Sequence, residues 1–287
     1  MSPHRPRNPL FADGPRRWWP DVVMVTALLA ITALLWWPSP LVVLDVVIRD
    51  HVEADQPGWA LEIAAVFKFL GLPTLQAIVC TYLALCCARH HRSIRPLLPV
   101  GATWLLMAGT KELQRLSDRV FPHWPDCPPR CPDTDTGPEG AAFFAGQGFD
   151  AFPSGHSIAT ATWFGLAVWL LPRLGVAWRW ALAVTPSVLL TAGQTYLGYH
   201  WATDSVGGIL LGVLLSRTVR RFPWDTVPLG PLDLLERHIP GGPGRRGQSA
   251  HRSFSRTSVS AARRLSASAS LPSTTAPIRN RPEVSEP

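Results

Sequence analysis

The chain has 287 residues, of which 47% are hydrophobic, and its formal net charge is +7. The apolar residues form blocks of about 16–22 residues, long enough to cross a hydrocarbon core of roughly 30 Å, which argues against an ordinary soluble domain. The positive charge lies on the connections between blocks and on the C-terminal tail, so anionic lipid headgroups are favoured over nucleic acid as its partner.

Six apolar blocks follow one another, and each predicts a transmembrane helix. They run approximately over residues 22–37, 72–88, 97–113, 156–172, 177–197 and 202–218. The first block lacks a clear small-residue cleavage site, so we expect a retained anchor rather than a signal peptide. A shorter apolar segment, 59–71, carries Glu62 and Lys68 and predicts a helix in the membrane interface.

The connections between the blocks alternate in charge. Arginines precede the first block, separate the second from the third and the fourth from the fifth, and follow the sixth, whereas the other two long connections are acidic loops. Because Lys and Arg accumulate on cytoplasmic loops, we expect both termini in the cytoplasm and both acidic loops outside. The predicted fold class is therefore all-α: a polytopic bundle of six transmembrane helices in the cell membrane.

Three parts of the chain differ in composition. Residues 1–20 form a cytoplasmic N-terminal segment, 21–222 the membrane domain, and 223–287 a basic tail rich in Ser, Pro and Arg that we expect to be largely disordered. Cys127 and Cys131 lie in the second outer loop, where an oxidising environment would permit a disulfide. A metal site there would lack an obvious fourth ligand, so we favour no metal.

Three polar clusters, 109–119, 151–157 and 193–204, fall at the predicted outer ends of spans. Ionisable residues at membrane level are costly and usually mark function. In the second cluster, a helix that begins near His156 would point unpaired N–H groups at an anion. Ser154 offers a hydroxyl, Gly155 permits close approach, and His156 could protonate a leaving oxygen. The alternative is an ordinary serine N-cap beside an incidental surface histidine.

The other two clusters carry further candidates. His200 and Asp204 are four residues apart, and a carboxylate that accepts from one ring nitrogen leaves the other nitrogen free to attack. The alternative is a polar interfacial pair that caps the helix. Helical spacing would turn Lys111, Arg115 and Arg119 toward one cavity, unless they form only a cationic helix end that faces headgroups.

Together these motifs resemble the type 2 phosphatidic acid phosphatase (PAP2) superfamily over roughly residues 21–222. That family has a lysine–arginine motif, then Pro-Ser-Gly-His, then Ser-Arg, five residues, His, three residues and Asp. Pro153–His156 reproduces the second motif, and His200 and Asp204 reproduce the end of the third.

The resemblance implies a role for each matched residue. His200 would be the nucleophile that forms a phosphohistidine, Asp204 would orient it, and His156 would protonate the departing group. The phosphate oxygens would be held by Lys111, Ser154 and the Gly155 amide. No metal or cofactor is implied.

Two departures from the family pattern affect this assignment. Position 118 is Asp where the family has the first-motif arginine, so Arg115 or Arg119 would substitute, and we favour Arg119. The third-motif Ser-Arg pair is Gly193-Gln194, and glutamine donates a hydrogen bond without a positive charge. Losing one donor of such a clamp can lower the rate about 10²–10³-fold.

The sequence thus predicts a phosphatase that acts on a lipid phosphate or diphosphate at the extracytoplasmic face. Candidate substrates are polyprenyl diphosphate, phosphatidate and phosphatidylglycerophosphate. Two alternatives stay open: a phosphotransferase that uses the same intermediate, and a non-catalytic lipid-phosphate-binding membrane protein in which Gln194 replaces the family arginine.

Overall fold

The computed structural model describes residues 14–122, 138, 141–144 and 150–232. Within these ranges the chain forms eight helices and no strand beyond an isolated bridge between Arg119 and Asp150. The helices are α1 (Trp19–Leu34), α2 (Pro40–Ala54), α3 (Gly58–Leu70), α4 (Pro73–His91), α5 (Leu97–Arg115), α6 (Gly155–Leu170), α7 (Val176–Tyr196) and α8 (Ala202–Arg221).

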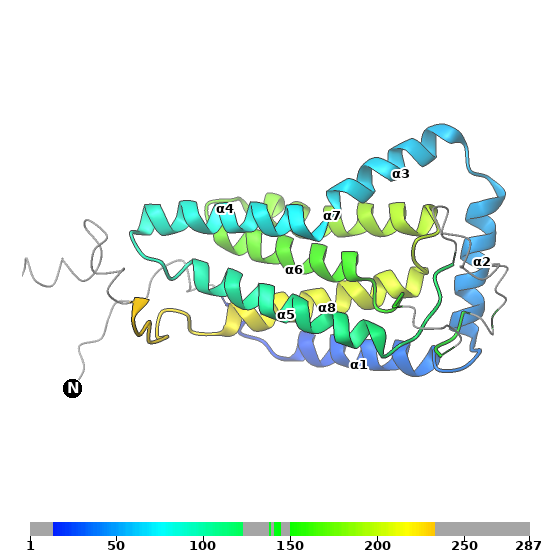
Figure 1. Cartoon of the computed structure of the whole chain (residues 1–287), viewed down its shortest axis with the longest axis horizontal. Helices are drawn as coiled ribbons and strands as arrows, with labels where there is room; N and C mark the ends of the chain where they lie inside the picture. The colour runs from blue at the N-terminus through cyan, green and yellow to red at the C-terminus, as the bar shows by residue number, and fades with distance from the viewer. Residues whose placement is uncertain (1–13, 123–137, 139–140, 145–149, 233–287) are drawn as a thin grey trace, which may run out of the picture.

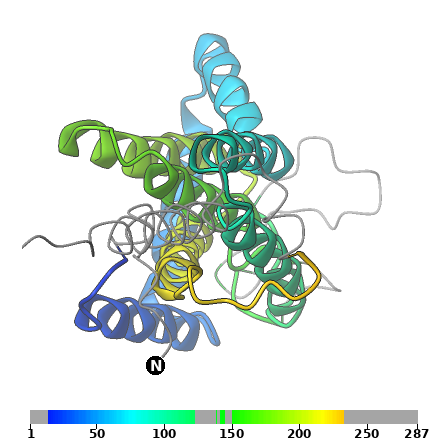
Figure 2. The same cartoon turned by 90° about the vertical axis from the view of Figure 1, so that its left-hand side faces the viewer.

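Six of these helices, α1 and α4 to α8, run along the long axis of the molecule (Figure 1). Each of them coincides with one of the six apolar blocks, which confirms the all-α prediction. Helix α2 stands across one end of the bundle, and α3 leans outward from that end (Figure 1). Seen end on, α1 and α3 lie at opposite sides of the bundle (Figure 2).

The outer faces of the bundle are apolar. Exposed large side chains include Leu29 on α1, Ile78 on α4, Leu105 on α5 and Val188 on α7. An exposed apolar surface of this extent is typical of contact with lipid or with another protein. Among the described residues, α8 alone is long and apolar enough to span a membrane by length and composition, while α1 and Gly58–Phe67 form shorter apolar helices.

Helix α6 lies at the centre, and α8 packs closely against it. Gly208, Gly212 and Ser216 recur at four-residue spacing on α8, as expected for a close helix crossing. A Cβ on Gly212 would lie 2.5 Å from the Ile158 carbonyl oxygen, and Thr162 Oγ1 donates to the Gly212 carbonyl at 3.1 Å. This packing fixes the start of α6 against the start of α8.

The first acidic connection is a helix rather than the loop that we expected. Ser39 caps α2 by accepting from the Leu41 and Val42 amides, and Pro40 occupies the first turn. Val42 and Val46, one turn apart, are buried in a core cluster at this end of the bundle. The segment predicted at 59–71 is helix α3. Cys127, Cys131 and the tail beyond residue 232 lie outside the described residues.

Candidate active site

A pocket of about 450 Å³ lies where α5 ends and α6 and α8 begin. Its apolar wall includes Pro73, Met107, Phe121 and Ala159. The polar side chains that line it come from α5, α6, α7 and the segments that join them: Thr110, Lys111, Gln114, Asp150, His156, Gln194, Tyr199 and His200. The three polar clusters of the sequence therefore meet in one cavity.

Two histidine rings face this pocket. His156 is the second residue of α6, and His200 lies two residues before α8. Their ring centroids are 6.3 Å apart, and the Phe121 ring packs against His200 at 5.3 Å. His200 is only 6% exposed, so its orientation is held by packing. A reacting atom bound between the two rings could contact both.

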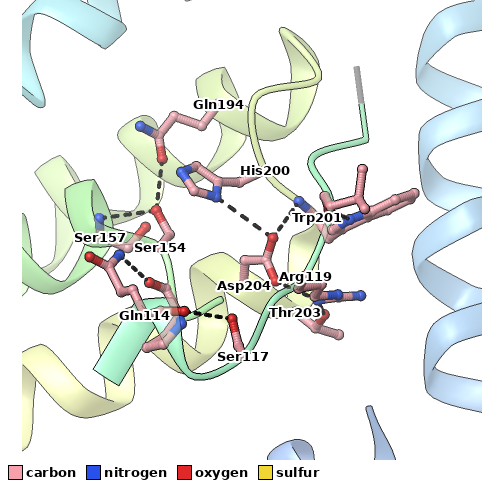
Figure 3. A network of polar contacts seen from close by, with 12 residues as sticks. Gln114, Ser117, Arg119, Ser154, Ser157, Gln194, His200, Trp201, Thr203 and Asp204 are labelled. Carbon is pink, nitrogen blue, oxygen red and sulfur yellow. Dashed lines mark hydrogen bonds and ion pairs between the residues drawn. The ribbon is translucent and has the colours of Figure 1, made fainter. Parts of the chain in front are cut away.

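Asp204 lies behind His200. Its Oδ2 is 3.6 Å from His200 Nδ1 and accepts a hydrogen bond from the Trp201 amide at 3.1 Å. The first distance exceeds a direct hydrogen bond, and catalytic contacts of this kind commonly tighten when substrate binds. The other ring nitrogen of His200 points away from Asp204, toward Gln194 and Ser154 (Figure 3). The arrangement is that of an oriented imidazole with one nitrogen turned to the cavity.

Ser154 caps helix α6 and is fully buried. Its Oγ accepts from the Ser157 amide at 3.4 Å and donates to Gln194 Oε1 at 3.2 Å, and its own amide donates to the Asp204 carbonyl at 2.9 Å. The serine thus lies beneath the pocket, outside its lining, and joins α6, α7 and α8. Because Ser154 occupies Gln194 Oε1, the amide nitrogen of Gln194 is the donor that can face the pocket (Figure 3).

Gly155 makes room for another side chain of the site. A Cβ at this position would lie 2.8 Å from Gln114 Nε2, which donates to the Pro153 carbonyl at 2.7 Å. Gln114 is 2% exposed and lines the pocket, and its Oε1 has no hydrogen-bond partner among the described residues. Gln114 was not among the residues predicted from the sequence, although its position three residues after Lys111 places both on one helix face.

The structure brings one of the two helical cations on α5 to the pocket. Lys111 lines the cavity, and its Nζ is 3.8 Å from a carboxylate oxygen of Asp150, a residue that no spacing had indicated. The Arg115 side chain is 67% exposed, donates to Glu112 at 2.8 Å and is not part of the pocket lining.

Arg119 does not share a helix face with Lys111. Helix α5 ends at Arg115, and Asp118 adopts a positive φ of 42°, so the chain has left the helix before Arg119. Arg119 is fully buried, and its Nε donates to the Ala141 carbonyl at 2.8 Å. Its two terminal nitrogens bind Asp45, Thr203 and Asp204.

Asp45 was missed because it lies on α2, far in sequence from every motif. Its carboxylate accepts from Arg119 Nη2 at 2.7 Å and from the Thr203 amide at 3.1 Å. Burial raises the pKa of the Asp45 carboxyl above its ordinary value, and the Arg119 guanidinium opposes that shift. Within the described residues, no cluster of three His, Cys, Asp or Glu is arranged to hold a metal.

Known proteins of one family are similar to the part of the chain that carries these motifs. Residues 122–228 match the model of the PAP2 superfamily. Over 66 residues the chain is 32% identical to an undecaprenyl-diphosphatase of Sulfolobus acidocaldarius, and over 65 residues 37% identical to a candidate undecaprenyl-diphosphatase of Escherichia coli K12. Each match covers 23% of this chain and only about three tenths of the relative, 30% and 31% respectively.

A solved structure is similar over most of the chain. The transmembrane PAP2-type phosphatidylglycerolphosphate phosphatase of Bacillus subtilis matches with a TM-score of 0.53 and 22% identity, covering 74% of this chain and 99% of that one. At this identity the likeness establishes the fold alone. The family match covers the segment that carries His156 and His200, and it confirms the resemblance to the PAP2 superfamily that these motifs indicated.

Proposed function

We propose that this protein is an integral membrane phosphatase that releases phosphate from a lipid phosphate or lipid diphosphate. The observation that carries the proposal is the single pocket lined by His156, His200 and Lys111, with the Asp204 carboxylate behind His200. The apolar wall of the same pocket suits a phosphate whose alcohol is a lipid.

In the first step of the proposed reaction, the pocket-facing nitrogen of His200 attacks phosphorus. The bond from phosphorus to the lipid-side oxygen breaks as the new P–N bond forms, and His156 gives its proton to the departing oxygen. The phosphorylated ring becomes cationic, with its Nδ1–H turned to Asp204. Lys111 and the Gln194 amide would bind the phosphoryl oxygens.

In the second step, water attacks the phosphohistidine and the P–N bond breaks. His156, now neutral, takes a proton from the water, and inorganic phosphate leaves. An alcohol in place of water would make the protein a phosphotransferase, and product formation that depends on an added alcohol would distinguish that outcome.

We further propose that the six long-axis helices cross the membrane with both termini in the cytoplasm. Support comes from the exposed apolar side chains on the bundle and from the arginines at the end opposite the pocket, among them Arg89, Arg92 and Arg221. The pocket would then face the extracytoplasmic side of the cell membrane, with α3 in the adjacent interface.

The proposal is tested by inorganic phosphate release from a panel of polyprenyl diphosphate, phosphatidate and phosphatidylglycerophosphate, with the full-length protein in lipid vesicles. We expect release from at least one member and its loss in His200→Ala, while His90→Ala, an exposed histidine at the other end of α4, retains activity. Radiolabelled substrate should leave an acid-labile phosphoenzyme in the wild type.

Two results would contradict the proposed function. One is phosphate release that His200→Ala leaves unchanged. The other is binding of the lipid phosphates without turnover, which would make the protein a lipid-phosphate-binding module. The glutamine at position 194 makes this second outcome the relevant alternative, because the groups that would bind phosphate then include one cation fewer than in the family pattern.

A further inference from the structure

A buried arginine lies between two buried carboxylates directly beneath the pocket. The side chains of Asp45, Arg119 and Asp204 are all 0% exposed. One terminal nitrogen of Arg119 binds Asp45 and the other binds Asp204, and the guanidinium also lies 5.5 Å from the centroid of the Trp201 ring. Thr203 links two of these groups, because its amide and hydroxyl donate to Asp45 while its Oγ1 accepts from Arg119.

The charge of this cluster is unbalanced. Two ionised carboxylates around one guanidinium give these three buried side chains a net charge of −1, which is costly unless a further cation lies nearby. Arg49 lies over the same Trp201 ring, 5.5 Å from its centroid, but its charge is paired with that of Asp50. The ring that meets Asp204 from the pocket side is His200, at 3.6 Å. A positive charge on this ring would therefore neutralise the cluster.

Asp204 alone would not provide that balance. Its Oδ1 is engaged by Arg119, so the two form a pair of zero net charge. The Asp45 carboxylate supplies the second negative charge. It is the acceptor in its hydrogen bonds with Arg119 and Thr203, as an ionised carboxylate must be. Asp45 comes from α2, which carries none of the three motifs.

We propose that Asp45 is a positioning residue for the reaction at His200: through Arg119 it fixes the Asp204 carboxylate and supplies the negative charge that offsets the cationic ring of the phosphohistidine. The inference rests on the proposed function. It also assigns Arg119 to the support of Asp204, beneath the pocket, rather than to direct contact with phosphate.

The test compares Asp45→Asn with Asp50→Asn. Both change one carboxylate to an amide on α2, but Asp50 is exposed and paired with Arg49. Asparagine keeps the size of Asp45 and an acceptor for Thr203, and Arg119 retains Asp204, so the variant should fold. We expect kcat to fall about 10- to 100-fold, the range for loss of a partner that orients a reactive ring, with KM unchanged. Asp50→Asn should retain the wild-type kcat.

A double-mutant cycle shows whether the effect passes through Asp204. In an Asp204→Asn background, Asp45→Asn should change the residual kcat by no more than about twofold, since the two residues act as one unit. Equal loss in both backgrounds, or a kcat that Asp45→Asn leaves at the wild-type level, would overturn the proposal.

A second measurement does not need turnover. In ¹⁵N-histidine-labelled full-length protein, the His200 signal is identified by its loss in His200→Ala, and its protonation is followed by NMR. The other ionisable groups around the ring are the same in wild type and Asp45→Asn: Asp204 and Arg119 behind it, and His156, Lys111, Asp150 and Tyr199 in the pocket lining. We expect the pH at which His200 is half protonated to be lower in Asp45→Asn than in the wild type by about half a pH unit or more. If no lipid is hydrolysed but this shift is present, the proposed function fails and the positioning role stands; an unchanged midpoint overturns the positioning role.

Discussion

The ring of His156 lies 6.3 Å, centroid to centroid, from that of His200, and the buried Asp204 carboxylate lies 3.6 Å from His200 Nδ1. We propose different roles for these two chemically identical side chains. An imidazole that is oriented from behind by Asp204 suits nucleophilic attack, whereas His156, at the start of α6, is placed to give a proton to the group that leaves.

Replacement of His156 by alanine should therefore separate the two roles. We expect the rate of lipid phosphate hydrolysis to fall about 10²–10⁴-fold, because an alkoxide leaves poorly without a proton. With p-nitrophenyl phosphate, whose leaving group needs no proton, formation of the phosphoenzyme should fall far less. Rapid-quench labelling of the enzyme with both substrates measures the difference. An equal loss with both would show that His156 serves only the structure or binding of the site.

The two cations on α5 should differ in importance. Lys111→Gln should raise KM about 10- to 100-fold, as expected for the loss of a hydrogen bond to a charged group, because Lys111 lines the pocket. Arg115→Gln removes an exposed side chain that binds Glu112, so its KM should match that of the wild type. Steady-state kinetics on one lipid phosphate provides both values. A larger effect for Arg115 would mean that it turns into the pocket when substrate binds.

Much of this site was predictable because its residues belong to short local patterns. The turn that begins α6 and the four-residue spacing of His200 and Asp204 are local features, and apolar block length located the helices that bring them together. Arg119 was misplaced on a helix face because the end of α5 at Arg115 depends on the positive φ of Asp118, which asparagine and aspartate tolerate but do not require. Asp45 carried no signal, since a contact across the fold leaves no spacing in one sequence.

The charge at position 194 should control the rate. Glutamate is close in size to Gln194 and can still accept from Ser154, but it brings a negative charge to the phosphate, so Gln194→Glu should lower kcat/KM about 10²–10³-fold. Gln194→Arg adds the cation that the family has here and should raise kcat/KM about tenfold. Phosphate release by the three proteins at saturating and limiting substrate gives the comparison. Loss of activity in both variants would indicate that the bond to Ser154 matters more than charge.

The stability of the fold should carry a pH dependence from Asp45. Burial raises the pKa of the Asp45 carboxyl above its ordinary value, so ionisation of this carboxyl costs the folded state some stability. The stability that the protonated carboxyl gives to the folded state is fully present below the unfolded-state pKa of Asp45, and it is lost as the pH rises through the folded-state pKa. Asp45→Asn has no such titration. The melting temperature of Asp45→Asn minus that of the wild type, both in the same detergent, should therefore increase between about pH 4 and pH 7. A constant or falling difference would show that Arg119 outweighs burial at this carboxyl.

The close crossing of α6 and α8 should be sensitive to a single methyl group. In Gly212→Ala the new Cβ would lie 2.5 Å from the backbone oxygen of Ile158 and 2.8 Å from Ala161 Cβ, so the helices must separate. Overpacking of this kind costs about 1–3 kcal/mol. Gly109→Ala on α5 is the matched control, because a Cβ there meets nothing within 4 Å. Thermal unfolding in detergent should show a lower melting temperature for Gly212→Ala only. Its kcat should fall as well, because the displacement moves the start of α6, with His156, away from the start of α8, with Asp204; a kcat equal to that of Gly109→Ala would show that the site does not depend on this contact.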